Sequence, residues 1–526
     1  MRCHSLLFDG PQPDAPQPDA ADHPERAGAG AVDQRGEPDY FGDVNLDQVV
    51  DRVTAGRGEY ALHHLYYAPV RDEAVVRYRH AVLADLERDD VAAALGAFAD
   101  QLRTARRYLA QTGRLRSHYQ GQRWRLDAMA AYRDAVLGLA DDLAALDLSS
   151  RGLARVREYV AQYAASETFC ALASETEARL RELSEVTYCV AIKGNRVTVR
   201  PYGGEADLSE EIHATFAKFR TGAVRDYRVV LPQRVEMNHV EARILDLVAE
   251  QHPHVFAALE EHCRRHHEFI DPALATLERE SQFYLAYLEH IAPLRNAGLP
   301  FCYPEVSTAA TALEARDAFD LALAHKLARS GGEVVTNDVE LRDGERALVV
   351  TGPNQGGKTT FARMVGELSH LAGLGLPVPG SRARLFLPDR IYTHFEREES
   401  LATLRGKLED DLERMKRILD AATPDSLVIV NEAFTSTSVQ DALRLSSEVL
   451  EALLDRGLLC VYVTFLDELS RLSEATVSLV TAVDPDDPAV RTFRVERRPA
   501  DGLAYAAAIA DKHGLTYQRL KERLPG

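Results

Sequence analysis

The sequence lacks paired cysteines, long hydrophobic runs and an excess of positive charge. No apolar stretch reaches the length of a membrane span, and the first residues lack the basic-then-apolar order of a signal peptide. The six cysteines are scattered with no C-x-x-C pair, at Cys3, Cys170, Cys189, Cys263, Cys302 and Cys460. Neither a disulfide framework nor a zinc knuckle is therefore expected, and the simplest prediction is a reduced, cytoplasmic protein.

The formal net charge is −19 over 526 residues. A charge of this sign argues against blanket, non-specific binding to nucleic acid, although a local basic surface is still possible because steering depends on where the charges lie. A chain of this length exceeds what one compact core usually holds, so roughly two to four domains are expected.

The amino-terminal part of the sequence divides into a polar tail and a long helical region. Residues 1–38 contain two copies of Pro-Gln-Pro-Asp-Ala and few apolar residues, which predicts a disordered acidic tail. From about 40 to 300, apolar residues recur at helical spacing, with long periodic runs at 126–146, 151–183 and 239–292. These runs predict extended helices packed as arms. One interruption, at 188–200, reads as a strand, a Gly-Asn turn and a second strand.

From about residue 308 the pattern changes to alternating strands and helices. Apolar strand candidates lie at 347–351, 427–431, 459–464 and 477–483, separated by helical stretches. This order is typical of a mainly parallel sheet that is covered by helices.

The segment TGPNQGGKTT at 351–360 matches G-x-x-x-x-G-K-[ST] between a predicted strand and a predicted helix. Glycines let the backbone turn so that several N–H groups point at one polyphosphate; the lysine adds a charge for the β- and γ-phosphates, and the hydroxyl that follows it can reach Mg²⁺. The loop predicts ATP or GTP binding by Gly352, Pro353, Asn354, Gln355, Gly356, Gly357, Lys358, Thr359 and Thr360.

A second half of the site follows the strand SLVIVNE at 426–432. A buried strand that ends in two carboxylates would supply one to the Mg²⁺ shell and one as general base for the attacking water. Here the first position is Asn431, whose amide oxygen can accept a hydrogen bond from a metal-bound water but carries no charge. Weaker Mg²⁺ binding is expected, with Glu432 as the catalytic base beside Lys358.

These segments together resemble the ATPase domain of the MutS mismatch-repair family, a relative of ABC-type ATPases. The similarity extends to AFTSTSVQD at 433–441, TNDV at 336–339, DRIYT at 389–393 and AYAAAIA at 504–510, and so covers 334–515. More loosely, FGDVNL at 41–46, APVRD at 68–72 and Tyr78-Arg79 resemble the start of the family's helical core domain.

The resemblance implies a multidomain fold with an all-α core and lever arms, a small β-containing clamp insertion and an α/β P-loop ATPase domain. It places a disordered tail at 1–38, a core domain at 39–150, lever helices at 151–307 with the clamp at about 187–235, and the ATPase domain at 308–526. It also implies ATP and Mg²⁺ as cofactors, a homodimer formed through the ATPase domains, and DNA as partner. Nucleotide contacts from Val334, Thr437, Ser438 and Asp441 are implied as well.

Several family positions differ in this chain. The adenine-stacking aromatic falls on Val334, the signature serine on Gly406 and the switch histidine on Phe465. No mismatch-reading domain or Phe-x-Glu motif precedes 41, so mismatch recognition is not expected. Taken together, these differences favour a divergent and slow ATPase.

Two basic segments are candidates for contact with nucleic acid. Residues 101–126 hold seven arginines with no Asp or Glu, and Trp124 lies among them: Arg103, Arg106, Arg107, Arg114, Arg116, Arg123 and Arg125. The alternative is a solvated helix face or pairing with nearby carboxylates. The β element and the residues after it carry the second group, Lys193, Arg196, Arg200, Lys218, Arg220, Arg225 and Arg228.

A histidine cluster formed by His262, Cys263, His266 and His267 has helical spacing but no evident fourth ligand, so a solvated helix face is expected there.

Two functions remain open from the sequence. One is an ATP-hydrolysing DNA-binding protein of repair or recombination. The other is a nucleotide-gated scaffold that binds ATP, hydrolyses it negligibly and recruits protein partners.

Overall fold

The computed structural model describes residues 5–8, 36–113, 115, 117–194, 196–204, 237–308, 313–396, 406–484, 487, 490–500 and 521. Most of the expected acidic tail, the second half of the expected clamp and the segment at 504–510 lie outside these residues. Within them, no helix is long and apolar enough to cross a membrane. The chain forms two compact units, one built from Arg88–Leu148 and Leu153–Ser281, and one from residues up to Glu87, Ser149–Gly152 and Gln282 onward.

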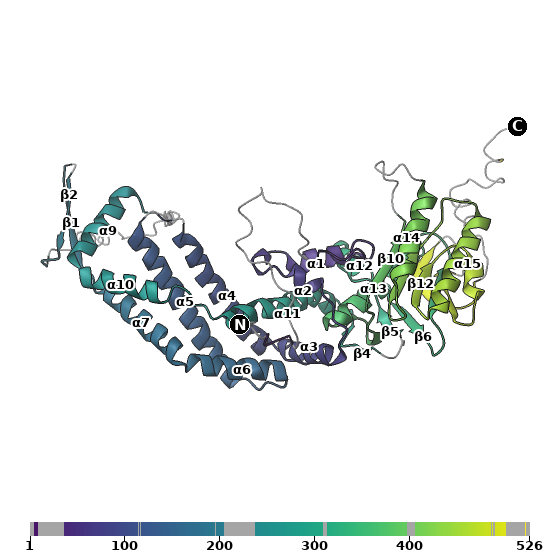
Figure 1. Cartoon of the computed structure of the whole chain (residues 1–526), viewed down its shortest axis with the longest axis horizontal. Helices are drawn as coiled ribbons and strands as arrows, with labels where there is room; N and C mark the ends of the chain where they lie inside the picture. The colour runs from purple at the N-terminus through teal and green to yellow at the C-terminus, as the bar shows by residue number, and fades with distance from the viewer. Residues whose placement is uncertain are drawn as a thin grey trace, which may run out of the picture. The chain divides into compact units, whose positions relative to one another are not determined.

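The first unit consists of helices and one β-hairpin. Its elements are α4 (Asp89–Thr112), α5 (His118–Ala145), α6 (Arg151–Ala164), α7 (Glu167–Ser184), β1 (Tyr188–Lys193), β2 (Arg196–Pro201), α9 (His239–Gln251), α10 (Pro253–Arg265) and α11 (Pro272–Asn296). Helices α6 and α11 each begin in one unit and end in the other. Helices α5, α7 and α10 pack against one another (Figure 1).

The hairpin predicted at 188–200 is confirmed. Strands β1 and β2 pair antiparallel with Lys193 opposite Arg196 at the turn. Gly194, in the turn, has φ +63°, a conformation that a residue without Cβ adopts freely.

The long helices expected at 151–183 and 239–292 are instead broken into shorter ones. Ser166 caps α7 by accepting a hydrogen bond from the Phe169 N–H, and Asn238 with Glu241 forms a capping box at the start of α9. Pro253 begins α10, at the first-turn position that proline favours. The breaks before α7 and before α10 therefore have a cap or proline signal that apolar periodicity alone does not report.

The second unit contains the sheets. Its helices are α1 (Leu46–Thr54), α2 (His63–Tyr66), α3 (Glu73–Leu86), α12 (Leu321–Ser330), α13 (Lys358–Leu374), α14 (Lys407–Ala421) and α15 (Val439–Asp455). Its strands are β3 (Phe301–Cys302), β4 (Glu305–Ser307), β5 (Leu313–Ala318), β6 (Asn337–Leu341), β7 (Ala347–Thr351), β8 (Val378–Pro379), β9 (Arg382–Phe386), β10 (Ile391–Phe395), β11 (Leu427–Asn431), β12 (Leu459–Val463), β13 (Thr476–Val483) and β14 (Arg491–Arg497).

The main sheet has the order β10-β11-β12-β7-β13-β14, in which only β14 runs antiparallel to its neighbour. The mainly parallel sheet and its four predicted strands are thus confirmed. Strands β7, β11 and β12 are buried along their whole length, as expected for strands covered on both faces. Helices α14 and α15 pack on the face formed by Val349, Val428 and Tyr462, and α13 contacts the same strands (Figure 1).

The expectation of disorder throughout 1–38 does not hold for residues 5–8. Leu7 and Phe8 are buried, and the Phe8 ring stacks on Tyr284 with centroids 5.4 Å apart. The Tyr284 hydroxyl donates a hydrogen bond to the Leu7 carbonyl at 3.0 Å. The run Leu6-Leu7-Phe8 offers apolar area that the average composition of the tail conceals.

A buried carboxyl pair ties α13 to the start of α12. Glu367 of α13 is fully buried and accepts hydrogen bonds from the backbone N–H of Leu321 at 2.7 Å and of Ala322 at 3.5 Å. Burial, followed by the neighbouring Asp320 carboxylate, raises the pKa of Glu367 well above its ordinary value. The folded protein therefore holds this carboxyl protonated at pH values where the unfolded chain ionises it.

Glu367→Gln should make the free energy of unfolding less sensitive to a rise in pH. Because the pKa of Glu367 is raised in the folded state, this carboxyl contributes its full stabilisation below its unfolded pKa, which is near 4.5. That contribution to the free energy of unfolding is lost as the pH rises toward the folded pKa. In urea unfolding, the free energy of unfolding of the variant relative to that of the wild type should rise by about 1 kcal/mol or more from pH 5 to pH 8. The reason is that one unit of pKa shift corresponds to about 1.4 kcal/mol. Exposed Glu409→Gln on α14 is the control, and an equal difference at both pH values would contradict the assignment.

Candidate functional site

The loop between β7 and α13 has the backbone of a tight anion-binding turn. Gly352 has φ +119°, Gln355 +60° and Gly357 +99°. Helix α13 begins at Lys358 with Gly357 as its N-cap, and no side chain caps its first N–H groups. These uncapped donors at a helix start are free to bind an anionic oxygen.

Close packing requires glycine at two positions of the loop, and at Gly352 the positive φ requires it as well. A Cβ added at Gly352 would lie 2.3 Å from the Thr481 hydroxyl, and one at Gly356 would lie 2.6 Å from the same atom. Thr481 is a fully buried residue of β13, so it cannot move away. The loop is therefore seated directly on the neighbouring strand of the sheet.

Lys358 lies under the loop with its side chain 4 % exposed. Its ammonium group donates to the carbonyl oxygens of Gly352 at 3.0 Å and Pro353 at 3.4 Å, and to Asn354 Oδ1 at 3.4 Å. Burial lowers the pKa of Lys358, and the Glu432 carboxylate, 3.6 Å from Nζ, opposes that shift. A buried cation is thus held at the loop by weak partners that an anionic ligand can replace.

The end of β11 brings the other predicted residues to the loop. Thr359 Oγ1 donates a hydrogen bond to Asn431 Oδ1 at 2.9 Å. Glu432, the next residue, has φ +52°, and its N–H donates to the Val463 carbonyl at 2.9 Å. A non-glycine residue in this conformation is strained, and such strain is concentrated at functional sites.

A cavity of about 450 Å³ opens beside the loop. Gln355 to Thr360 and Glu432 line one part, and the remainder includes Phe319, Leu323, Leu327, Met364, Val334 and Phe493. A volume of this size falls within the range of small-molecule sites, which are mostly apolar with a few polar groups. The arrangement combines a polar end for phosphate with an apolar end for a ring system.

A model of MutS domain V matches residues 348–511, which include the loop, Asn431, Glu432 and Phe493. Residues 348–511 therefore carry a domain of the MutS family. It is 33 % identical over 205 residues to the endonuclease MutS2 of Gemmatimonas aurantiaca, covering 38 % of this chain and 25 % of that protein. It is 32 % identical over 190 residues to the endonuclease MutS2 of Thermus thermophilus, covering 36 % and 26 %.

A DNA mismatch repair protein MutS, from Thermotoga neapolitana, is 32 % identical over 193 residues, covering 36 % of this chain and 24 % of that protein. The chain thus spans about a quarter of the length of the MutS relatives it matches. The residues that the domain V model matches lie within the unit that holds the main sheet and the loop.

Phe493 is a residue of the cavity that sequence reasoning missed. It lies on β14 with φ +57° and 48 % of its surface exposed, beside Gly357. Val334, at the position where the MutS resemblance puts an aromatic, lines the same cavity. The sequence does contain a signal for Phe493, because it is the only aromatic residue in the charged strand Arg-Thr-Phe-Arg-Val-Glu-Arg. An aromatic side chain on the exposed face of such a strand does not pack in a core, which suggests another role.

Other MutS-implied residues lie apart from the cavity lining. Ser438 caps α15, with Oγ accepting from the Asp441 N–H at 3.2 Å and donating to Asp441 Oδ2 at 2.7 Å. Thr437 is half-buried and Gly406 is exposed, and Phe465 is 45 % exposed. Of the residues predicted to bind nucleotide or Mg²⁺, those that the structure brings together at the cavity are therefore the loop, Val334, Asn431 and Glu432.

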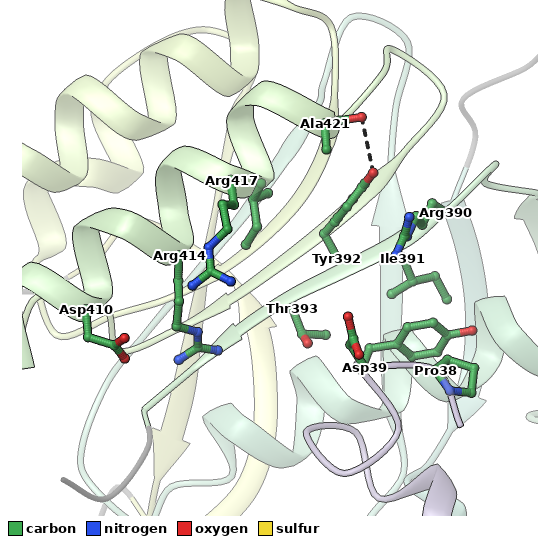
Figure 2. A pocket seen from close by; sticks show the side chains of 12 residues that line it. Pro38, Asp39, Arg390, Ile391, Tyr392, Thr393, Asp410, Arg414, Arg417 and Ala421 are labelled. Carbon is green, nitrogen blue, oxygen red and sulfur yellow. Dashed lines mark hydrogen bonds between the residues drawn. The ribbon is translucent and has the colours of Figure 1, made fainter. Parts of the chain in front are cut away.

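A second cavity, of about 550 Å³, lies between the start of β10, helix α14 and residues 38–40. Figure 2 shows Arg414 and Arg417 extending from α14 toward the strand that carries Tyr392 and Thr393. The Tyr392 hydroxyl donates to the Ala421 carbonyl at 3.1 Å. The two cavities share no lining residue, so Arg417→Ala provides a control for variants of the loop.

The basic stretch at 101–126 is largely paired within its own unit. Arg103 lies 3.1 Å from Asp100, Arg123 lies 2.9 Å from Asp127, and Arg106 pairs with buried Glu278. Arg125 donates to the His267 carbonyl at 3.1 Å. The alternative of intramolecular pairing thus accounts for these four side chains, while Arg114 and Arg116 lie outside the described residues.

Proposed function

We propose that this chain is an ATP-dependent DNA-binding protein, in which ATP and Mg²⁺ bind at the loop cavity and are used by a dimer of ATPase domains. The observation that carries the proposal is the meeting of Lys358, Thr359 and Glu432 at the ends of β7 and β11. Buried cation, hydroxyl and carboxylate are the groups that phosphoryl transfer to water requires.

Each residue then has a definite part. Lys358 and the uncapped N–H groups of α13 hold the β- and γ-phosphates. The oxygens of Thr359 and Asn431 are hard donors that suit Mg²⁺, Asn431 through a water, and the ion would neutralise phosphate charge. Glu432 accepts a proton from the attacking water. Because neither metal-side donor is charged, Mg²⁺ is held weakly and turnover is slow.

Phe493→Ala should weaken ATP binding about 5-fold or more, because stacking of a base on an aromatic ring contributes about 1–3 kcal/mol. The Phe493 ring lines the cavity beside Gly357, and Val334 of the same lining offers no aromatic surface. Isothermal titration should show that Phe493→Tyr retains affinity. Inorganic triphosphate, which has no base, should bind Phe493→Ala and wild type equally; an equal loss for both ligands would contradict stacking.

DNA binding is the second part of the proposal. Relatives named as a DNA mismatch repair protein and as endonucleases are 32–33 % identical to this chain over 190 to 205 residues. The hairpin β1–β2 presents Lys193 and Arg196 on its exposed surface, where contacts to phosphates would fix position without reading bases. Helices of the first unit would act as lever arms and the 187–235 element as a clamp, with closure of the dimer driven by ATP.

Gel-shift titrations test this part directly. Homoduplex, mismatched, flapped and four-way DNA would each be titrated with and without ATP, at two salt concentrations. Salt-dependent binding that changes with ATP is expected, and it should weaken when Lys193 and Arg196 are both replaced by glutamine. Unchanged affinity in that variant would reject the clamp assignment, and no binding to any substrate would reject the DNA partner.

The nucleotide-gated scaffold is the alternative, and the neutral pair Thr359–Asn431 favours it. An aspartate at 431 would supply the negative charge that the metal side lacks. If the natural protein is a scaffold with negligible hydrolysis, Asn431→Asp should raise the rate of phosphate release strongly. A slow but measurable wild-type rate that is stimulated by DNA, and only modestly changed by Asn431→Asp, supports the enzyme.

A further inference from the structure

Three metal-binding side chains meet between helices α7 and α10, far along the chain from the phosphate loop. Glu175, His262 and His266 each offer a ligand atom, and these atoms all lie within 4.8 Å of one another. Glu175 Oε2 is 3.1 Å from His262 Nδ1 and 3.4 Å from His266 Nε2. The solvated helix face expected for these histidines is wrong for His262, which is 2 % exposed.

The spacing of the donors matches a tetrahedral cation site. Zn²⁺ lies about 2.0–2.1 Å from imidazole nitrogen and about 2.0–2.2 Å from carboxylate oxygen, so neighbouring ligands in a tetrahedron are about 3.3 Å apart. The two measured separations, 3.1 and 3.4 Å, fall on either side of that value. Two of the three donor pairs thus already have the separation that one ion needs, and the third pair lies within 4.8 Å.

Outer contacts hold the ligands in place. His262 Nε2 lies 3.1 Å from Oγ1 of Thr176, a fully buried residue, which leaves Nδ1 directed at Glu175. Arg265 binds the other carboxylate oxygen, Oε1, at 2.8 Å, so that Oε2 faces the imidazoles. Metal-binding histidines and carboxylates are usually oriented by hydrogen bonds of this kind.

The neighbouring candidates from the sequence are not part of the cluster. Cys263 Sγ lies 3.7 Å from the carbonyl of Gln122 on α5. The His267 side chain is 70 % exposed and lies 3.8 Å from Glu268. The third ligand comes from α7, about ninety positions away, where helical spacing around His262 could not reveal it.

We propose that Glu175, His262 and His266 form a binding site for a divalent cation of the Zn²⁺ class, with a water completing the tetrahedron. The side chains of His266 and Glu175 are 13 % and 36 % exposed, which gives an ion and a water access from solvent. The site joins α7 to α10 and is independent of nucleotide. Arg265 limits its affinity, because its positive charge lies beside the carboxylate.

Metal titration of the full chain tests the site. Protein stripped with a chelator and titrated with Co²⁺ should develop the intense visible absorption of tetrahedral cobalt at one equivalent, and Zn²⁺ should displace it. His266→Ala and Glu175→Gln should lose this signal, whereas His267→Ala should keep it. Circular dichroism confirms that each variant is folded.

Either of two results would reject a metal site formed by Glu175, His262 and His266. If the carboxylate merely bridges two imidazoles by hydrogen bonds, the stripped protein takes up no Co²⁺ and thermal unfolding is unchanged by Zn²⁺. Signal that persists in His266→Ala, or that disappears in His267→Ala, also rejects this ligand set. None of these readouts depends on ATP or DNA, so failure here is distinct from failure of the proposed function.

Discussion

Lys358→Ala should weaken ATP binding by about 100-fold and abolish detectable hydrolysis. The ammonium group is buried, and its present partners are loop carbonyls, an amide oxygen and Glu432 at 3.6 Å. A bound triphosphate would replace these contacts with charge-assisted ones that water screens poorly. Loss of one partner of a buried charge pair costs about 3 kcal/mol, which corresponds to about 100-fold in affinity.

Titration calorimetry with ATP and Mg²⁺ measures this effect. Arg417→Ala, in the cavity that shares no residue with the loop, should bind ATP like the wild type. Thermal unfolding without ligand shows whether the alanine variant has kept its fold. If a folded Lys358→Ala variant binds ATP within a few-fold of the wild type, the polyphosphate does not lie on this loop.

Glu432→Gln should retain ATP binding and lose hydrolysis by about 10²- to 10⁴-fold, the usual contribution of a positioned general base. Glutamine has the same shape but cannot accept the proton of the attacking water. Its neutral amide also removes a negative charge 3.6 Å from Lys358, so affinity for the anionic ligand should be equal or higher. The separation of binding from turnover distinguishes a base from a binding residue.

Single-turnover release of phosphate measures the chemical step. Glu333→Gln is the matched control, because Glu333 is a carboxylate of the same cavity that belongs to the segment before β6 and not to the end of β11. Its rate should stay near that of the wild type. If Glu432→Gln hydrolyses ATP as fast as the wild type, Glu432 is not the general base. If the wild type itself shows no turnover, the nucleotide-gated scaffold is the function that is supported.

Much of the carboxy-terminal unit could be predicted because its signals are local. Strands β7, β11 and β12 are continuous apolar runs, and the glycine-rich loop stands directly between a strand and a helix. The hairpin turn at Gly194 is equally local. The helix breaks at Ser166 and Pro253 also have local signals, but periodicity outweighed them in the prediction.

By itself, the sequence determined the glycine-rich loop between a strand and a helix, the succession of Asn431 and Glu432, and the apolar runs that form strands, since each depends on residues close together in the chain. Only the tertiary structure decided that Phe493 faces the loop, that Thr481 seats Gly352 and Gly356, and that Glu175 meets two histidines. Likewise, the pairing of Arg106 with Glu278 needed the fold. Contacts between distant segments depend on how helices and strands pack, and no spacing within one element records that packing.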